Sequence, residues 1–175
     1  EVLSRFGKGD VALFQNETNL VPELMKKADR RGLRVAFNAA PFTEDVRRFP
    51  LELVSWLFVN EIEGASLSGE QKPEKIAARL RKLYPNTELI LTLGAEGCLY
   101  AGGEGVFSVP AADVVPVDTT AAGDTFTGYY LMAALAGEGA KRALEIASAA
   151  SGLAITRMGA ADSIPSIGQV REILQ

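Results

Sequence analysis

Short apolar runs alternate along this chain with amphipathic segments, and the alternation limits the folds that the chain can adopt. The first apolar run, residues 11–15, has the length of a buried strand. Residues 21–31 follow with the spacing of an amphipathic helix, in which Pro22 suits the first turn and Gly32 the end. A second apolar run occupies residues 33–38. A strand, a helix and a strand in this order predict a βαβ unit with parallel strands and a right-handed crossover.

The same alternation continues through the rest of the chain. Further strands are predicted at residues 53–59 and 89–92, and a hairpin at 97–100 and 106–109. The remaining predicted helices are 60–68, 73–84, 125–135, 140–157 and 167–174. In the helix at 73–84, Ile76, Leu80 and Leu83 form the apolar face, and residues 38–48 are predicted to be a loop. This pattern predicts an α/β fold with a largely parallel sheet covered by helices on both faces.

Composition excludes several classes of function. The 175 residues fit one domain, and 47% hydrophobic with 23% charged residues is typical of a globular protein. A net charge of −4 provides no broad field for nucleic acid or an anionic membrane, so neither is an expected partner. The chain has no histidine, which excludes Ser-His-Asp triads, Cys-His dyads and His-based metal sites.

The single cysteine, Cys98, excludes an internal disulfide and fits a reducing compartment. It lies in an apolar run, which favours buried packing over reactivity. No apolar run reaches membrane-spanning length and no signal peptide is visible, so we expect a cytoplasmic location. Because the first residue is Glu rather than Met, we also expect the chain to be a piece of a longer protein.

Residues 117–126 carry the strongest chemical signal. Asp118 and Asp124 bracket a run of small residues, and an apolar segment at 128–136 follows. This order predicts a loop that turns into the N-terminus of a buried helix, where free N–H groups bind anions and an acid can accept a proton. The alternative is simple helix capping by either Asp. Because ligands of parallel α/β sheets bind beyond the carboxyl ends of the strands, we expect this loop to join the polar residues there.

Residues 118–124, Asp-Thr-Thr-Ala-Ala-Gly-Asp, resemble the signature D-T-x-[GA]-A-G-D of the ribokinase family, the PfkB-type carbohydrate kinases. No GxxxxGK[ST] or strand–GxGxxG–helix unit competes with it. The resemblance implies a ribokinase-like three-layer αβα sandwich and ATP-dependent phosphorylation of a sugar hydroxyl, with ribose or a related carbohydrate as acceptor. It also implies that Asp124 is the base and contacts the sugar, while Ala121, Ala122 and Gly123 offer N–H groups to the transferring phosphoryl group.

Asn60 and Glu63 form an N-x-x-E pair just past the predicted strand 53–59. Their spacing fits a helix capping box. From the residues alone, this interpretation and a functional one are equally well supported. The resemblance implies a role in placing Mg²⁺ and phosphate, with Glu63 acting on the metal through water. One carboxylate is enough for Mg²⁺, which keeps several waters.

The segment 92–97, Thr-Leu-Gly-Ala-Glu-Gly, is similar to the T-L-G-x-x-G segment that lies beside the nucleotide in the same family. The resemblance therefore implies nucleotide contacts from Thr92, Gly94 and Gly97. The alternative is a strand-to-turn junction that requires glycine. The resemblance also places the adenine pocket against the helix at 140–157, around Ser148. Close packing against another helix is the alternative reason for the small residues of this helix, and it accounts for some of them.

Residues 155–163 are similar to the segment that supplies oxygen atoms to a monovalent cation, K⁺ for example, in ribokinases. The implied contributors, mostly through backbone carbonyls, are Asp118, Thr120, Ala154, Arg157, Gly159 and Ser163. A glycine-terminated helix followed by a loop is an equal alternative. Glu17 aligns with a position that faces the sugar, and the alternative there is a solvated acid in a turn.

The resemblance runs from about Asp10 to the end of the chain but corresponds only to the second half of a family member. Residues 1–175 would then be the C-terminal nucleotide-binding and catalytic portion, without the N-terminal half, its sugar contacts and its lid. We therefore expect ATP and a small sugar as ligands, a homodimeric full-length parent, and weak or absent kinase activity for these residues alone. The missing half also leaves an unpaired sheet edge, which favours association. The alternative is a non-catalytic nucleotide- or sugar-binding module of the same fold.

Overall fold

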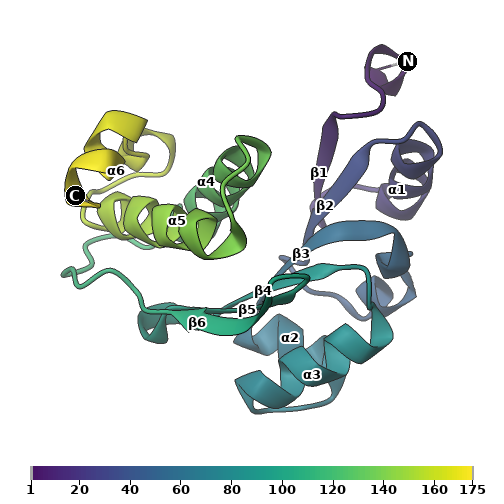
Figure 1. Ribbon diagram of the computed structural model, residues 1–175, viewed down its shortest axis with the longest axis horizontal. Helices are drawn as coiled ribbons and strands as arrows, with labels where there is room; N and C mark the ends of the chain where they lie inside the picture. The colour runs from purple at the N-terminus through teal and green to yellow at the C-terminus, as the bar shows by residue number, and fades with distance from the viewer. Residues whose placement is uncertain (1, 175) are drawn as a thin grey trace. The chain divides into compact units, whose positions relative to one another are not determined.

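The computed structural model describes residues 2–174, which divide into two compact units (Figure 1). The first unit comprises the chain up to Thr92 together with Leu99–Val106. The second unit comprises Leu93–Cys98 together with the chain from Phe107 onward. None of the helices within the described residues is long and apolar enough to cross a membrane.

Within residues 2–174 the strands form a six-stranded sheet whose spatial order follows the chain order. The strands are β1 (Val11–Gln15), β2 (Arg34–Asn38), β3 (Val54–Asn60), β4 (Glu88–Thr92), β5 (Cys98–Gly102) and β6 (Gly105–Val109). The pairs β1–β2, β2–β3 and β3–β4 are all parallel. This arrangement confirms the predicted α/β class with a largely parallel sheet.

Three α-helices of the first unit connect its strands: α1 (Val21–Arg30), α2 (Glu61–Ser68) and α3 (Pro73–Leu83). α1 buries Val21, Met25 and Ala28, which share one helix face because they are four and three residues apart. The chain leaves α1 at Gly32, whose φ of +76° is a conformation that favours glycine. β3 buries Trp56–Val59 almost completely, as a strand covered on both faces should.

The apolar face of α3 differs from the prediction at one position. Ile76, Ala77 and Leu80 are buried, whereas the side chain of Leu83 is 42% exposed. Leu83 is the last residue of α3, and the chain turns away at Tyr84, so the helix contributes no further turn to cover it.

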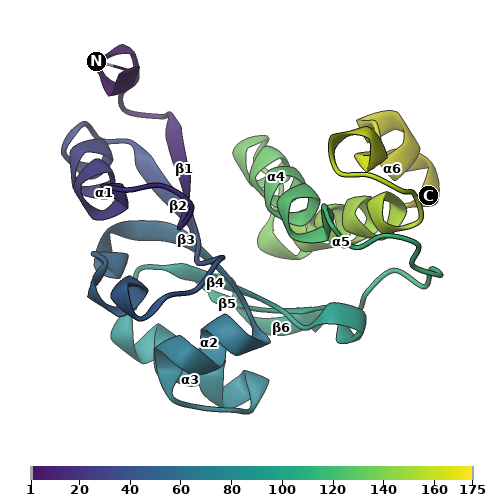
Figure 2. The ribbon, with the colours of Figure 1, turned by 180° about the vertical axis from the view of Figure 1, so that it is seen from behind.

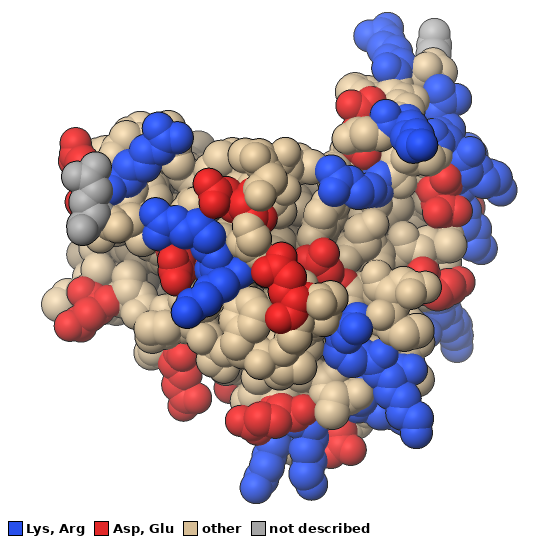
Figure 3. Space-filling model, viewed as in Figure 1, with Lys and Arg blue, Asp and Glu red and all other residues tan. Residues whose placement is uncertain are grey.

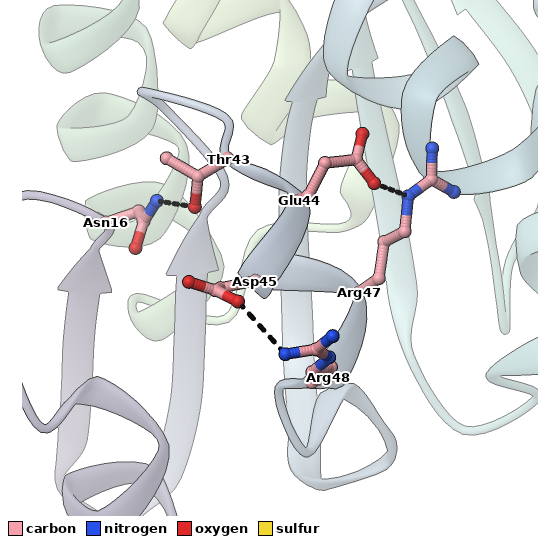
Figure 4. A network of polar contacts seen from close by, with 6 residues as sticks. All are labelled: Asn16, Thr43, Glu44, Asp45, Arg47 and Arg48. Atoms are coloured by element: carbon pink, nitrogen blue, oxygen red, sulfur yellow. Dashed lines mark hydrogen bonds and ion pairs between the residues drawn. The ribbon is translucent and has the colours of Figure 1, made fainter.

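The connection from β2 to β3, predicted as a loop, contains two 3₁₀ helices, η2 (Glu44–Arg48) and η3 (Leu51–Leu53). Figure 4 shows the two ion pairs of η2, in which Arg47 and Arg48 reach carboxylates three residues earlier at 2.7 and 3.4 Å. Ahead of η2, the Asn16 amide donates to Thr43 Oγ1 at 3.2 Å and to the Pro41 carbonyl at 2.7 Å. These contacts join the end of β1 to the connection. The ion pairs are exposed, so each adds little stability.

The second unit is mainly helical, with α4 (Ala122–Leu135), α5 (Ala140–Ile155) and α6 (Ile167–Ile173). α4 lies along α5, and α6 packs on α5, as Figure 2 shows from behind. The buried face of α5 is built mostly from alanine, with Ala143, Ala147 and Ala150 fully covered. Side chains this small allow two helices to approach closely.

α4 differs from the predicted helix in two ways. It begins at Ala122 rather than Thr125, because the Thr125 N–H already donates to the carbonyl of the N-cap residue Ala121 at 2.9 Å, which is the first hydrogen bond of the helix. It is also less buried than predicted, since Met132 and Leu135 are 41% and 47% exposed. The earlier start places Gly123 and Asp124 inside the first helical turn.

Candidate active site

The first turn of α4 presents free backbone donors. Ala121 is the N-cap residue, and Ala122 N–H is occupied by Thr119 O at 3.1 Å. Among the described residues, no hydrogen-bond acceptor pairs with the N–H groups of Ala121 or Gly123. A Cβ added at Gly123 would meet no other atom within 4 Å, so the space beside this turn is open. Of the two residues, Gly123 is exposed and Ala121 is buried. Free N–H groups at the positive end of a helix can bind an anionic group.

Asp124 follows these donors directly and lines an open pocket of about 460 Å³ within the second unit. The other lining residues, mostly apolar, are Thr125, Gly128, Tyr129, Met132, Ile164, Ile167 and Arg171. The Tyr129 hydroxyl already donates to the Pro165 carbonyl. The pocket therefore offers a sugar few hydrogen-bonding groups besides the carboxylate of Asp124.

Asp118 holds the loop before α4 in shape. Its Oδ1 accepts from Thr120 Oγ1 at 2.5 Å and from Thr120 N at 3.0 Å, and its Oδ2 accepts from Gly159 N at 3.0 Å. The Thr120 hydroxyl, followed by the Gly159 and Thr120 backbone N–H groups, lowers the pKa of this carboxyl below its ordinary value. Asp118 thus joins the loop to the segment after α5.

The residues implied in cation binding are only partly connected. Asp118, Thr120 and Gly159 are joined directly by the hydrogen bonds to the Asp118 carboxylate. Ala154 O, one of the expected ligands, accepts from Arg157 N at 3.2 Å. Ser163 is buried and directs both its N–H and its hydroxyl to Ala160 O. The described residues contain no cluster of three or more Cys, Asp or Glu that could hold a metal.

Ser148, expected near the adenine, lies on α5 with its hydroxyl 3.9 Å from the Cys98 thiol. Cys98 is fully buried, as predicted, and burial raises the pKa of its thiol to about 11. The Ser148 hydroxyl therefore already has a neighbour inside the second unit.

Gly94 and Gly97 enclose the 3₁₀ turn η4 (Gly94–Glu96), with φ values of +55° and +95°. Leu93 N donates to Gly97 O at 2.8 Å, which closes the turn. A Cβ at Gly97 would lie 2.1 Å from Val109 O, a distance that no side chain tolerates. The strand-to-turn interpretation thus explains Gly97 without a ligand, while its role beside a nucleotide stays a prediction.

The Asn60–Glu63 pair, in the first unit, forms a complete capping box at the start of α2. Asn60 Oδ1 accepts from Glu63 N and Glu63 Oε2 accepts from Asn60 N, both at 2.9 Å. Burial raises the pKa of the Glu63 carboxyl, and the Asn60 N–H opposes this shift. Asn60 is also the register partner of Thr92, so the ends of β3 and β4 meet as predicted. One carboxylate oxygen of Glu63, Oε2, is used by the cap.

Glu17 lies exposed in the turn after β1. It shares the first unit with Asn60, Glu63 and Thr92, whereas the other predicted site residues belong to the second unit. The structure therefore joins Asn60 with Glu63 and Thr92 in the first unit, and Asp118 with Thr120 and Gly159 in the second.

Two residues beside the predicted base were not identified from the sequence. Thr125 Oγ1 is buried and has no partner among the described residues. Ser151, on α5, donates its hydroxyl to Ala122 O at 2.9 Å. The signal for Ser151 was weak, because one serine among alanines and glycine resembles ordinary close packing.

Comparison with known proteins assigns the chain to a family. Residues 17–167 match the pfkB family of carbohydrate kinases. Ribokinase from Bacillus subtilis is 30% identical over 174 residues, which cover 98% of this chain and 57% of that protein. A 2-dehydro-3-deoxygluconokinase from Thermoproteus tenax is 29% identical over 171 residues, covering 94% of this chain and 52% of its own length.

Solved structures agree with this result. Thermotoga maritima ribokinase superposes with a TM-score of 0.83 at 32% identity, covering 94% of this chain and 56% of its own. Arabidopsis thaliana ribokinase, solved with ribose and ATP, superposes with a TM-score of 0.84 at 25% identity, covering 94% of this chain and 55% of its own. The chain thus spans a little over half the length of these relatives, and it belongs to the pfkB family of carbohydrate kinases.

Proposed function

We propose that this chain is the nucleotide-binding and catalytic portion of an ATP-dependent kinase that phosphorylates a sugar hydroxyl. Family membership supports the reaction class, since similar chains are named ribokinases and one is solved with ribose and ATP. We take ribose as the first acceptor to test. The observation that carries the proposal is the first turn of α4, where two N–H groups without partners among the described residues precede Asp124.

In this proposal Asp124 accepts the proton of the acceptor hydroxyl as that oxygen bonds to the γ-phosphorus of ATP. The bond from the γ-phosphorus to the bridging oxygen breaks, and ADP leaves with the electron pair. Charge on the transferring group is stabilised by the N–H groups of Ala121 and Gly123. Ala122 N–H contributes less in this conformation, because it is already paired with Thr119 O. Phosphoryl transfer depends mainly on positioning and charge stabilisation, so these groups suffice.

Two cations fit the residues present. Mg²⁺, when bound to the nucleotide, neutralises phosphate charge, and Glu63 would hold it through water with its second carboxylate oxygen. A monovalent cation such as K⁺ would bind near Asp118, whose Oδ2 accepts only one of the three hydrogen bonds made to that carboxylate. Carboxylate oxygens suit both ions. The Glu63 carboxylate is held in place by the hydrogen bond that its Oε2 accepts from Asn60 N.

The acceptor site is incomplete within this chain. The pocket beside Asp124 is lined mostly by apolar side chains, whereas a sugar needs several polar partners. Because the relatives are almost twice as long, we propose that the rest of a full-length protein supplies those partners, and that this protein is a cytoplasmic homodimer. The alternative of a non-catalytic binding module is less favoured, since Asp124 and its neighbouring N–H groups are retained.

A paired assay tests this proposal. Ribose and MgATP are supplied to residues 1–175 and to the full-length protein, and ADP and sugar phosphate are measured together. The full-length protein should form both products in equal amounts, while residues 1–175 alone should show weak or absent turnover. Calorimetry with a non-hydrolysable ATP analogue then separates nucleotide binding from turnover. Full turnover by residues 1–175, or none by the full-length protein with any sugar, would refute the proposal.

A further inference from the structure

A serine on α5 is bonded to the backbone of the proposed anion site. The hydroxyl of Ser151 donates to the carbonyl oxygen of Ala122 at 2.9 Å, across 29 residues of sequence. Ala122 is the first residue of α4, directly before Gly123. Both helices belong to the second unit, and they pack along each other.

The bonded carbonyl and the proposed donor are two ends of one peptide group. Ala122 C=O and Gly123 N–H belong to the same planar unit and point in opposite directions. A donor on the carbonyl oxygen therefore fixes the plane in which the N–H lies. It also polarises that N–H, because hydrogen bonds in a chain strengthen one another.

The bond is not the one that a helical serine makes by default. Serine and threonine in helices usually donate to a carbonyl three or four residues earlier in the same helix. Ser68 does so to Gly64 O at 2.7 Å, and Thr156 does so to Leu153 O at 2.7 Å. Ser151 instead donates to a different helix, at the turn that carries the unpaired Gly123 N–H. Close packing of α5 on α4 requires only a small side chain here, and alanine would satisfy it.

We propose that Ser151 is a positioning residue for phosphoryl transfer: its bond to Ala122 O orients and polarises the Gly123 N–H that stabilises the transferring group. The inference rests on the proposed kinase function, since it assigns a role within that reaction. Ser151 itself touches neither the nucleotide nor the sugar in this account. Its effect is expected on kcat rather than on the KM for ATP, because the charge that Gly123 N–H stabilises grows in the transition state.

The expected effect is modest. Removal of one donor of this kind lowers kcat by about 10²–10³, and one added hydrogen bond strengthens its neighbour by about 10–30%. Ser151→Ala in the full-length protein should therefore lower kcat about two- to eightfold, with the KM for ATP unchanged. Ser151→Cys keeps the volume with a weaker donor, and its kcat should fall between those of the wild type and the alanine variant.

The matched control is Ser68→Ala, which removes a similar hydroxyl-to-carbonyl bond from α2 and should leave kcat unchanged. A direct readout uses residues 1–175: the amide ¹⁵N resonance of Gly123 should move upfield in Ser151→Ala and stay in place in Ser68→Ala. Unchanged kcat in both Ser151 variants, an equal loss in Ser68→Ala, or an unmoved Gly123 resonance would overturn the inference. If the wild-type full-length protein phosphorylates no sugar, the proposed function fails, and the resonance of Gly123 still decides whether Ser151 polarises this peptide.

Discussion

Replacement of Gly123 by alanine tests whether this position needs glycine for folding or for phosphoryl transfer. The change adds one methyl group to the first turn of α4, where no other atom lies within 4 Å of the new Cβ. Alanine is favoured over glycine inside a helix by about 0.5–1 kcal/mol. We therefore expect Gly123→Ala to retain or slightly raise the free energy of unfolding.

The same methyl group should lower the rate of phosphoryl transfer. It stands beside the Gly123 N–H and prevents a phosphoryl oxygen from approaching that donor closely. Loss of one such donor lowers kcat by about 10²–10³. We expect this loss in the full-length protein with ribose and MgATP, measured as the rate of ADP formation.

Two other helical glycines calibrate the stability measurement. Gly128, further along α4, also has no atom within 4 Å of an added Cβ, so Gly128→Ala should stabilise by about 0.5–1 kcal/mol. At Gly64 the new Cβ would lie 2.9 Å from Ile76 Cγ2 and 3.2 Å from Leu91 Cδ1, both in buried side chains. Such overpacking costs about 1–3 kcal/mol, so Gly64→Ala should be less stable than the wild type by about 0.5–2 kcal/mol.

Urea unfolding followed by circular dichroism measures all three variants. If Gly123→Ala were destabilised as strongly as Gly64→Ala, packing would require the glycine. The space beside Gly123 would then not be open. If Gly123→Ala kept the wild-type kcat, the Gly123 N–H would have no part in the reaction.

Two further outcomes follow from the geometry. Cys98 should not react with a thiol reagent at pH 8 until the protein unfolds, because burial raises the pKa of its thiol to about 11. Rapid labelling of the native protein at pH 8 would contradict the buried position. The unfolded thiol ionises near its ordinary pKa of 9.0, so the stability that Cys98 contributes is complete below about pH 9 and is lost as the pH rises towards 11. Asn60→Ala breaks the capping box of α2 and should cost about 0.5–2 kcal/mol in urea unfolding, followed by the fluorescence of Trp56 in the neighbouring strand β3. An unchanged midpoint would show that the box adds no stability.

The sheet and its helices were predictable because their signals are local. Apolar runs and amphipathic segments gave the positions of β1 to β6 and of the α-helices, and the ends differ from the structure by three residues or fewer. The start of α4 was missed because its N-cap, Ala121, makes no side-chain cap bond. η2 was missed because a single 3₁₀ turn with ion pairs three residues apart leaves little periodicity.

The candidate site was only partly predictable for a physical reason. Asp118 to Asp124 are contiguous, so the sequence displays them together, whereas the hydrogen bonds from Thr120 to the Asp118 carboxylate are visible only in the structure. The bond from Ser151 to Ala122 O joins residues far apart in the sequence, and no local pattern reports it. The functional roles of Glu17, Thr92 and Ser148 stay predictions.

The role of Asp124 as the base is tested most directly by Asp124→Asn in the full-length protein. Asparagine keeps the shape of the side chain but cannot accept the proton of the acceptor hydroxyl, and general-base catalysis contributes about 10²–10⁴ to the rate. The measurement is kcat with ribose and MgATP, alongside the dissociation constant of ATP from calorimetry. We predict that turnover is abolished or falls by at least about 10², while the affinity for ATP is that of the wild type. An unchanged kcat would contradict the assignment of Asp124 and with it the central claim.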